Sequence, residues 1–167
     1  MRYLNLLAIN GEIMMRIKEG DLFEIETPEG KAYFQHIIKD PMMGHLIRVF
    51  PKIYSQALDY PEAIVKEKES FFTYFPLAAA LKKNIVRYVG KSNVPFESKK
   101  PTFMRQALSI GNGGKVLNWR IINMDSGEIE VVESLSEDQK KLSLRECWND
   151  TLLIERICER WKPEFYS

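Results

Sequence analysis

The sequence predicts a mainly β protein: an antiparallel barrel or sandwich of about seven to eight strands, with a C-terminal helix packed on it. Three observations support this fold class. Short runs rich in β-branched and aromatic residues recur along the chain, turns containing glycine or proline separate them, and the apolar pattern changes to a helical period near the C-terminus. The 167 residues, 45% of them hydrophobic, are enough to bury one core without a disulfide framework.

We expect a single domain over residues 17–167 and an N-terminal extension over residues 1–16. Met14 and Met15 stand directly before the first polar turn, so either is a candidate for the natural start. The alternative is that the apolar run within residues 1–15 is an ordinary edge strand. The run is too short for a signal peptide and lacks a small-residue cleavage site.

The expected strands follow from the apolar runs between turn signals. The first two surround the sequence Thr27-Pro28-Glu29-Gly30 and predict a β-hairpin. Pro76 can begin a short helix over residues 76–81, since its missing N–H does no harm at the first helical position. We expect residues 51–69 to form a long loop with one helical turn. The expected strands are 22–26, 31–39, 46–50, 71–75, 85–89, 102–110, 116–123 and 128–133.

Two helices are expected near the C-terminus. Ser134 and Glu137 have the spacing of a capping box and predict the start of a short helix. Asn149 or Asp150 can cap the second helix, which Pro163 would end. Its apolar stripe would cover one face or end of the strands, and it consists of Leu152, Leu153, Ile154, Ile157 and Trp161.

The two cysteines favour a reducing compartment. Cys147 and Cys158 are eleven residues apart, which on one continuous helix is about 16 Å and too far for a disulfide. We therefore expect both to be buried as small apolar residues, and the protein to be cytoplasmic. The longest uncharged window, residues 70–81, is far shorter than the roughly 20 residues that span a bilayer.

The residues that usually carry chemistry are sparse. His36 and His45 are the only histidines, fewer than the three ligands of a catalytic zinc site, so we expect no metal and no cofactor. His36 alternates with Phe34 and Ile38, which favours a partly buried, hydrogen-bonded histidine. The sequence has no Gly-x-Ser-x-Gly nucleophile motif, and Asp21 has no evident second carboxylate for acid–base catalysis. We therefore predict that the chain is not an enzyme.

One charge asymmetry could mark a binding surface. Net charge is only +1, but between Lys82 and Arg120 there are nine basic residues and a single acid, Glu97. The candidate partner-binding residues within this stretch are Arg87, Lys91, Lys99, Lys100, Arg105, Lys115 and Arg120.

The basic stretch allows three interpretations. Its aromatics can point into the core while its bases pair with the acidic flanks. It can instead face an acidic protein partner, where charge steers association. It can also bind single-stranded nucleic acid by charge and stacking. The aromatics that interleave with the bases are Tyr88, Phe96, Phe103 and Trp119.

A series of short motifs resembles a known family. The run Lys18-Glu19-Gly20-Asp21-Leu22-Phe23-Glu24-Ile25 precedes Val86-Arg87-Tyr88-Val89-Gly90 and Pro101-Thr102-Phe103-Met104. The Trp119 strand and the segment from Leu152 to Trp161 complete the series. Together they resemble the immunity protein 26 family of bacterial polymorphic-toxin systems, over residues 17–161.

The resemblance implies a mainly β protein that binds and neutralises a toxin made by the same cell. It transfers no catalytic residue, and Gly20, Asp21 and Gly90 would be structural. We therefore expect a non-enzymatic protein that occludes a cognate toxin. The alternative function is a nucleic-acid-binding β-barrel that uses the basic stretch.

Overall fold

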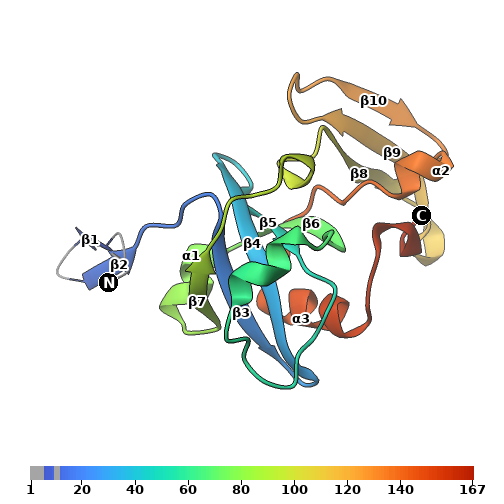
Figure 1. Cartoon of the computed structure of the whole chain (residues 1–167). Coiled ribbons are helices and arrows are strands. Elements are labelled where there is room, and N and C mark those ends of the chain that lie inside the picture. Colours follow the sequence, from blue (N-terminus) through green and yellow to red (C-terminus); the bar gives the residue numbers. More distant parts are fainter. Residues whose placement is uncertain (1–5, 10–11) are drawn as a thin grey trace.

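The computed structural model describes residues 6–9 and 12–167. Residues 21–132 form two antiparallel sheets, of five and three strands, and a short helix and a tail follow them (Figure 1). This confirms the mainly β class and the number of strands. Of the two predicted architectures the sandwich fits, because the strands within residues 21–132 form two separate sheets rather than one closed barrel.

Five strands make the larger sheet, in the spatial order β6-β5-β4-β3-β7. The turn between β3 and β4 contains Gly30, whose φ of +132° suits glycine. A Cβ on Gly30 would lie 2.4 Å from the Tyr54 carbonyl oxygen, so the turn also needs glycine for close packing. The strands are β3 (Asp21–Thr27), β4 (Gly30–Asp40), β5 (Gly44–Val49), β6 (Phe71–Phe75) and β7 (Val86–Lys91).

The smaller sheet has the order β10-β9-β8 and comprises β8 (Phe103–Ile110), β9 (Val116–Asn123) and β10 (Ile129–Val132). One segment that the sequence did not predict as extended joins it to the larger sheet. Arg145 N–H donates to the Arg105 carbonyl on β8 at 2.7 Å, and Trp148 N–H donates to the Tyr74 carbonyl on β6 at 2.9 Å. Residues 143–148 therefore run along one edge of each sheet.

Near the N-terminus, β1 (Leu6–Ile9) pairs with β2 (Glu12–Met15) in a two-stranded sheet of their own. The predicted extension over residues 1–16 includes residues 1–5 and 10–11, which lie outside the described residues. The extension stays a prediction.

The helical segments are short, and three of their ends differ from the predictions. Pro76 is the N-cap of α1 rather than its first residue. Ser136 caps α2 and forms a capping box with Gln139, so the true motif starts two residues after Ser134. The helical segments of the described chain are η1 (Pro61–Lys66), α1 (Leu77–Lys82), η2 (Phe96–Ser98), η3 (Asn112–Gly114), α2 (Glu137–Lys140), α3 (Asp150–Cys158) and η4 (Pro163–Phe165).

Helix α3 begins as predicted, because the Asn149 side chain accepts a hydrogen bond from Leu152 N–H at 2.8 Å. It ends at Cys158, earlier than the predicted stop at Pro163, because Arg160 adopts a φ of +54°. Trp161 therefore lies beyond the helix. It still packs in the core, with its ring centroid 5.2 Å from that of Trp148.

The largest core cluster lies between the two sheets and α3. It includes Phe34 and Phe71 from the larger sheet, Trp119 from the smaller sheet, and Leu153 from α3. No helix in the described residues is long and apolar enough to cross a bilayer.

We expect Leu153→Ala to lower the free energy of unfolding by about 2–5 kcal/mol, the usual cost of truncating a buried leucine. Leu153 is fully buried, whereas the matched control Leu117→Ala alters a leucine that is 49% exposed. Urea denaturation followed by tryptophan fluorescence measures both variants. Equal, small losses would show that α3 does not contribute to the core.

Candidate functional site

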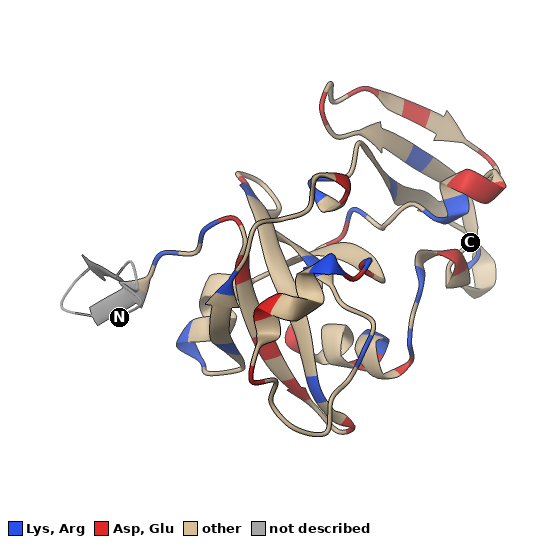
Figure 2. Ribbon diagram, in the orientation of Figure 1, with Lys and Arg blue, Asp and Glu red and all other residues tan. Residues whose placement is uncertain are grey.

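The structure does not collect the seven predicted basic residues on one face. Arg87 and Lys91 lie on β7, Lys99 and Lys100 follow η2, and the remaining three belong to the region of the smaller sheet. Figure 2 shows the corresponding blue segments on separate parts of the ribbon. Lys91, Lys99 and Lys115 are exposed, and Arg120 is half-buried.

Arg105 is fully buried and is therefore not a surface residue. Its Nε donates to the Leu142 carbonyl at 3.0 Å, its Nη2 donates to the carbonyls of Lys140 and Pro163, and its guanidinium lies 4.5 Å from the Trp119 ring centroid. Burial lowers the pKa of Arg105 to about 10, which keeps it charged at neutral pH. Its role is to hold the smaller sheet to the C-terminal segments.

Two other bases of the stretch pair with acids, as one of the three interpretations expected. Arg87 Nη2 lies 2.9 Å from Glu24 Oε1, and Lys100 Nζ lies 2.9 Å from Asp125 Oδ1. Burial of Glu24 tends to raise its pKa, but hydrogen bonds from Tyr33, Arg87 and other donors outweigh that effect and lower it. Arg87 thus fastens the edge strand β7 to β3.

The two histidines contact each other inside the larger sheet. His45 Nδ1 lies 3.1 Å from His36 Nε2, and the side chains are 9% and 3% exposed respectively. Sequence analysis predicted a partly buried, hydrogen-bonded His36; the contact with His45 fits a hydrogen bond, and His36 is more deeply buried than predicted. Burial, and then the charge of His36, lower the pKa of His45 to about 4. Across the described chain, no cluster of three or more His, Cys, Asp or Glu side chains is placed to hold a metal ion.

The prediction that both cysteines are buried is wrong for Cys147, which is exposed, while Cys158 is half-buried. Cys147 lies in the extended segment beside β6, not on a helix. Neighbouring side chains of an extended segment point to opposite sides, so the burial of Trp148 turns Cys147 outward. Both thiols are free.

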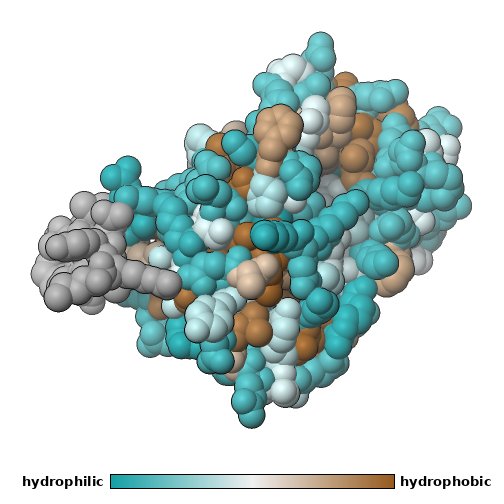
Figure 3. Space-filling model, in the orientation of Figure 1, coloured by the Kyte–Doolittle hydropathy of each residue, from teal (hydrophilic) through white to brown (hydrophobic). Residues whose placement is uncertain are grey.

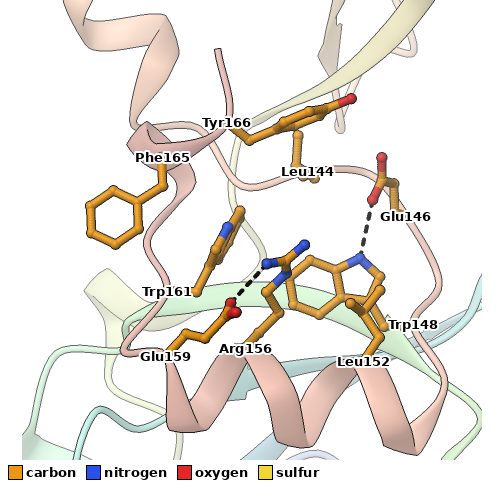
Figure 4. Close-up of a pocket in the computed structure, with 9 residues that line it drawn as sticks. All are labelled: Leu144, Glu146, Trp148, Leu152, Arg156, Glu159, Trp161, Phe165 and Tyr166. Atoms are coloured by element: carbon orange, nitrogen blue, oxygen red, sulfur yellow. Dashed lines mark hydrogen bonds and ion pairs between the residues drawn. The ribbon is translucent and has the colours of Figure 1, made fainter. Parts of the chain in front are cut away.

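A pocket of about 540 Å³ lies between α3 and the C-terminal tail (Figure 4). Trp148, Trp161, Phe165 and Tyr166 supply aromatic surface to it. Its charged groups are already satisfied: an ion pair at 2.8 Å joins Arg156 to a neighbouring glutamate, and Trp148 Nε1 donates to a carboxylate at 3.1 Å. The pocket can therefore accept an apolar or aromatic group, but it presents no constellation for bond-breaking chemistry.

The smaller sheet carries the largest group of exposed apolar side chains. We call this group, without Phe103, which lies on the other face of the sheet with Ile121, the apolar sheet surface; its members are 38–60% exposed and are Leu108, Ile110, Leu117, Ile129 and Val131. In Figure 3, brown side chains are visible at the upper right, where Figure 1 draws this sheet. Such gatherings on a protein surface mark interaction sites.

Acidic residues border the apolar sheet surface. Six acids and no base lie between Arg120 and Lys140 (Figure 2). Within the described chain no ion pair forms at Glu128, Glu130 or Glu133. The six acids, which we call the acidic rim, are Asp125, Glu128, Glu130, Glu133, Glu137 and Asp138.

Sequence reasoning missed this surface because it concentrated on the adjoining basic stretch. The base-free run of acids between Arg120 and Lys140 was a readable signal. The apolar sheet surface had no such signal, because the same apolar residues would be expected in a buried strand.

Comparisons with known proteins gave no matching family model, no similar curated protein and no similar solved structure. The resemblance to the immunity protein 26 family therefore stays a prediction.

The histidine pair generates a pH prediction. His45 binds a proton near pH 6.5 when unfolded but only near pH 4 when folded. The unfolded state therefore binds more protons between these values, and stability falls as the pH is lowered from 7 to 4, by up to about 3 kcal/mol. The variant His45→Gln should lose less stability over the same range. If urea denaturation shows that the wild type and His45→Gln lose the same stability between pH 7 and pH 4, the assignment to His45 is contradicted.

Proposed function

We propose that this chain is an immunity-type protein that binds a bacterial toxin and neutralises it by covering the toxin's active site. The observation that carries the proposal is the apolar sheet surface with its acidic rim. An apolar centre bordered by polar and charged groups is the anatomy of protein–protein interfaces. The residues that resemble the immunity protein 26 family support the same kind of partner.

Occlusion requires a stiff surface rather than a chemical step. Three hydrogen-bonded strands supply such a surface, and Arg105 anchors their inner side to the C-terminal segments. Toxins that cleave nucleic acid need basic clefts, and the acidic rim complements a cleft of that sign. Charge complementarity of this kind speeds association and disfavours wrong partners.

The alternative of nucleic-acid binding has less support. The basic residues lie on separate elements, Arg105 is buried, and two others are paired with acids. The acidic rim would repel phosphates. The alternative is therefore retained only as an outcome of the test.

The test is rescue of bacterial cells that express the toxin encoded beside this chain. The wild type should restore growth. Ile110→Asp, which places a charge in the apolar sheet surface, should weaken toxin binding at least about tenfold and reduce rescue. The matched control is Met42→Asp, at an 88% exposed residue in the turn between β4 and β5, and it should rescue fully.

Melting temperatures of both variants check that each is folded, since surface changes usually cost within about 0.5 kcal/mol. Lack of rescue by the wild type, together with submicromolar binding of single-stranded DNA or RNA at physiological salt, would replace this proposal with the alternative. Full rescue by folded Ile110→Asp would remove the apolar sheet surface as the contact.

A further inference from the structure

Strand β10 is an edge strand whose outer side is open. Among the described strands it pairs only with β9, in a register that places Ile129 opposite Ile122 and Val131 opposite Arg120. Asn123 N–H donates to the Glu128 carbonyl at 2.9 Å. Hydrogen-bonded and non-bonded pairs alternate along an antiparallel ladder, so Ile129 and Val131 fall in non-bonded pairs. Their N–H and C=O groups therefore point away from β9.

No other segment of the described chain forms a backbone hydrogen bond with these outward groups. The side chains of Ile129 and Val131 are each 56% exposed and share one face of the sheet. An open edge with apolar side chains is a template for a further strand. The outer side of β10 thus offers two donors, two acceptors and apolar contact area.

The opposite face of β10 has different chemistry. Glu130 points to that face and, with Asp138 of α2, lines a groove of about 270 Å³. Phe103 and Ile121 supply apolar surface to the same groove. Since strands alternate their side chains, an added strand would meet apolar groups on one face and carboxylates on the other.

The charges select among the possible occupants. Lys140 and Lys141 pair with Glu137 and Asp138 on α2, but Glu130 has no cation partner in the described chain. Pairing β10 with β10 of a second copy would bring the acidic rims of the two copies together, and like charges across a strand pair are destabilising. A basic strand would instead be attracted.

We propose that the free edge of β10 binds an extended basic segment of the partner protein as a fourth strand of the smaller sheet. The segment would alternate apolar side chains, over Ile129 and Val131, with lysine or arginine side chains, toward Glu130 and Asp138. This inference rests on the proposed function for the identity of the partner, while the edge itself can be tested without the partner. Recognition of this kind takes affinity from main-chain hydrogen bonds and specificity from alternate side chains.

The direct probe is a fluorescein-labelled peptide of seven alternating lysines and valines, blocked at both ends, titrated into the full chain and followed by anisotropy. We expect saturable binding that weakens as salt is added. The same peptide with glutamate in place of lysine should not bind. Equal binding of the two peptides would overturn the proposal, because charge would then not select the occupant.

Val131→Pro tests the edge, since it removes an outward N–H while leaving the ladder to β9 unbroken. We expect at least about tenfold weaker peptide binding, whereas the matched control Val131→Thr keeps the N–H and should bind like the wild type. A folded Val131→Pro that binds as tightly as the control would overturn the proposal. If Val131→Pro does not fold, the lysine peptide with N-methylated valines is titrated into the wild type instead, because it lacks the N–H donors of those residues. Binding as tight as that of the unmethylated peptide would overturn the proposal.

Charge on the groove face is tested by Glu130→Gln, with Glu155→Gln on the exposed side of α3 as the matched control. Only the first should weaken peptide binding, by a few-fold. Sedimentation equilibrium tests the remaining possible occupant, a second copy of the chain. If the wild type is a dimer and Val131→Pro abolishes the dimer, the edge binds a second copy and the basic-segment proposal is overturned.

Rescue separates the two proposals. If the wild type rescues cells and folded Val131→Pro rescues equally well, the edge is wrong and the proposed function stands. If the wild type does not rescue but the lysine peptide binds and Val131→Pro loses it, the edge stands and the toxin is not its partner.

Discussion

The guanidinium group of Arg105 is the contact on which the arrangement of the two sheets depends. It is fully buried on β8 and donates to backbone carbonyls of residues 140, 142 and 163. These carbonyls belong to the segments on either side of α3. A buried arginine without its acceptors is strongly unfavourable, so these two segments and the smaller sheet must assemble together. The stacking of the guanidinium on Trp119 links the same unit to the main core.

Arg48 plays a corresponding part in the larger sheet. It is also fully buried, and it donates to Gln35 Oε1 at 2.8 Å and to the Val65 carbonyl at 2.7 Å. Gln35 in turn donates to the carbonyls of Gly20 and Ser92. Both buried arginines thus hold loops through carbonyl oxygens, and Arg48 also forms an ion pair with Glu69 at 3.4 Å. Three acids of the acidic rim pair with lysines, whereas Glu128, Glu130 and Glu133, which lie on or beside β10, form no ion pair in the described chain.

The strands were predictable because their ends carry strong local signals, such as Gly30 in the first hairpin and Gly127 before β10. The pairing of the strands was not predictable, because β3 pairs with β7, which lies more than sixty residues later in the chain. The start of α2 was misplaced because two overlapping frames, beginning at Ser134 and Ser136, both satisfy the capping pattern. The burial of Arg105 was invisible for a different reason: a charge count cannot distinguish a solvated arginine from one that binds carbonyls.

The composition of the main core also determines when the protein can finish folding. This cluster joins residues from Phe23, near the start of the domain, to Trp161, close to the end of the sequence. During synthesis on a ribosome, the larger sheet would therefore emerge before the tryptophans and α3 that cover it. The aromatic strand Phe71–Phe75 would stay uncovered in that interval, and exposed apolar strands are prone to aggregation. The tryptophans and α3 thus protect strands that are made well before them.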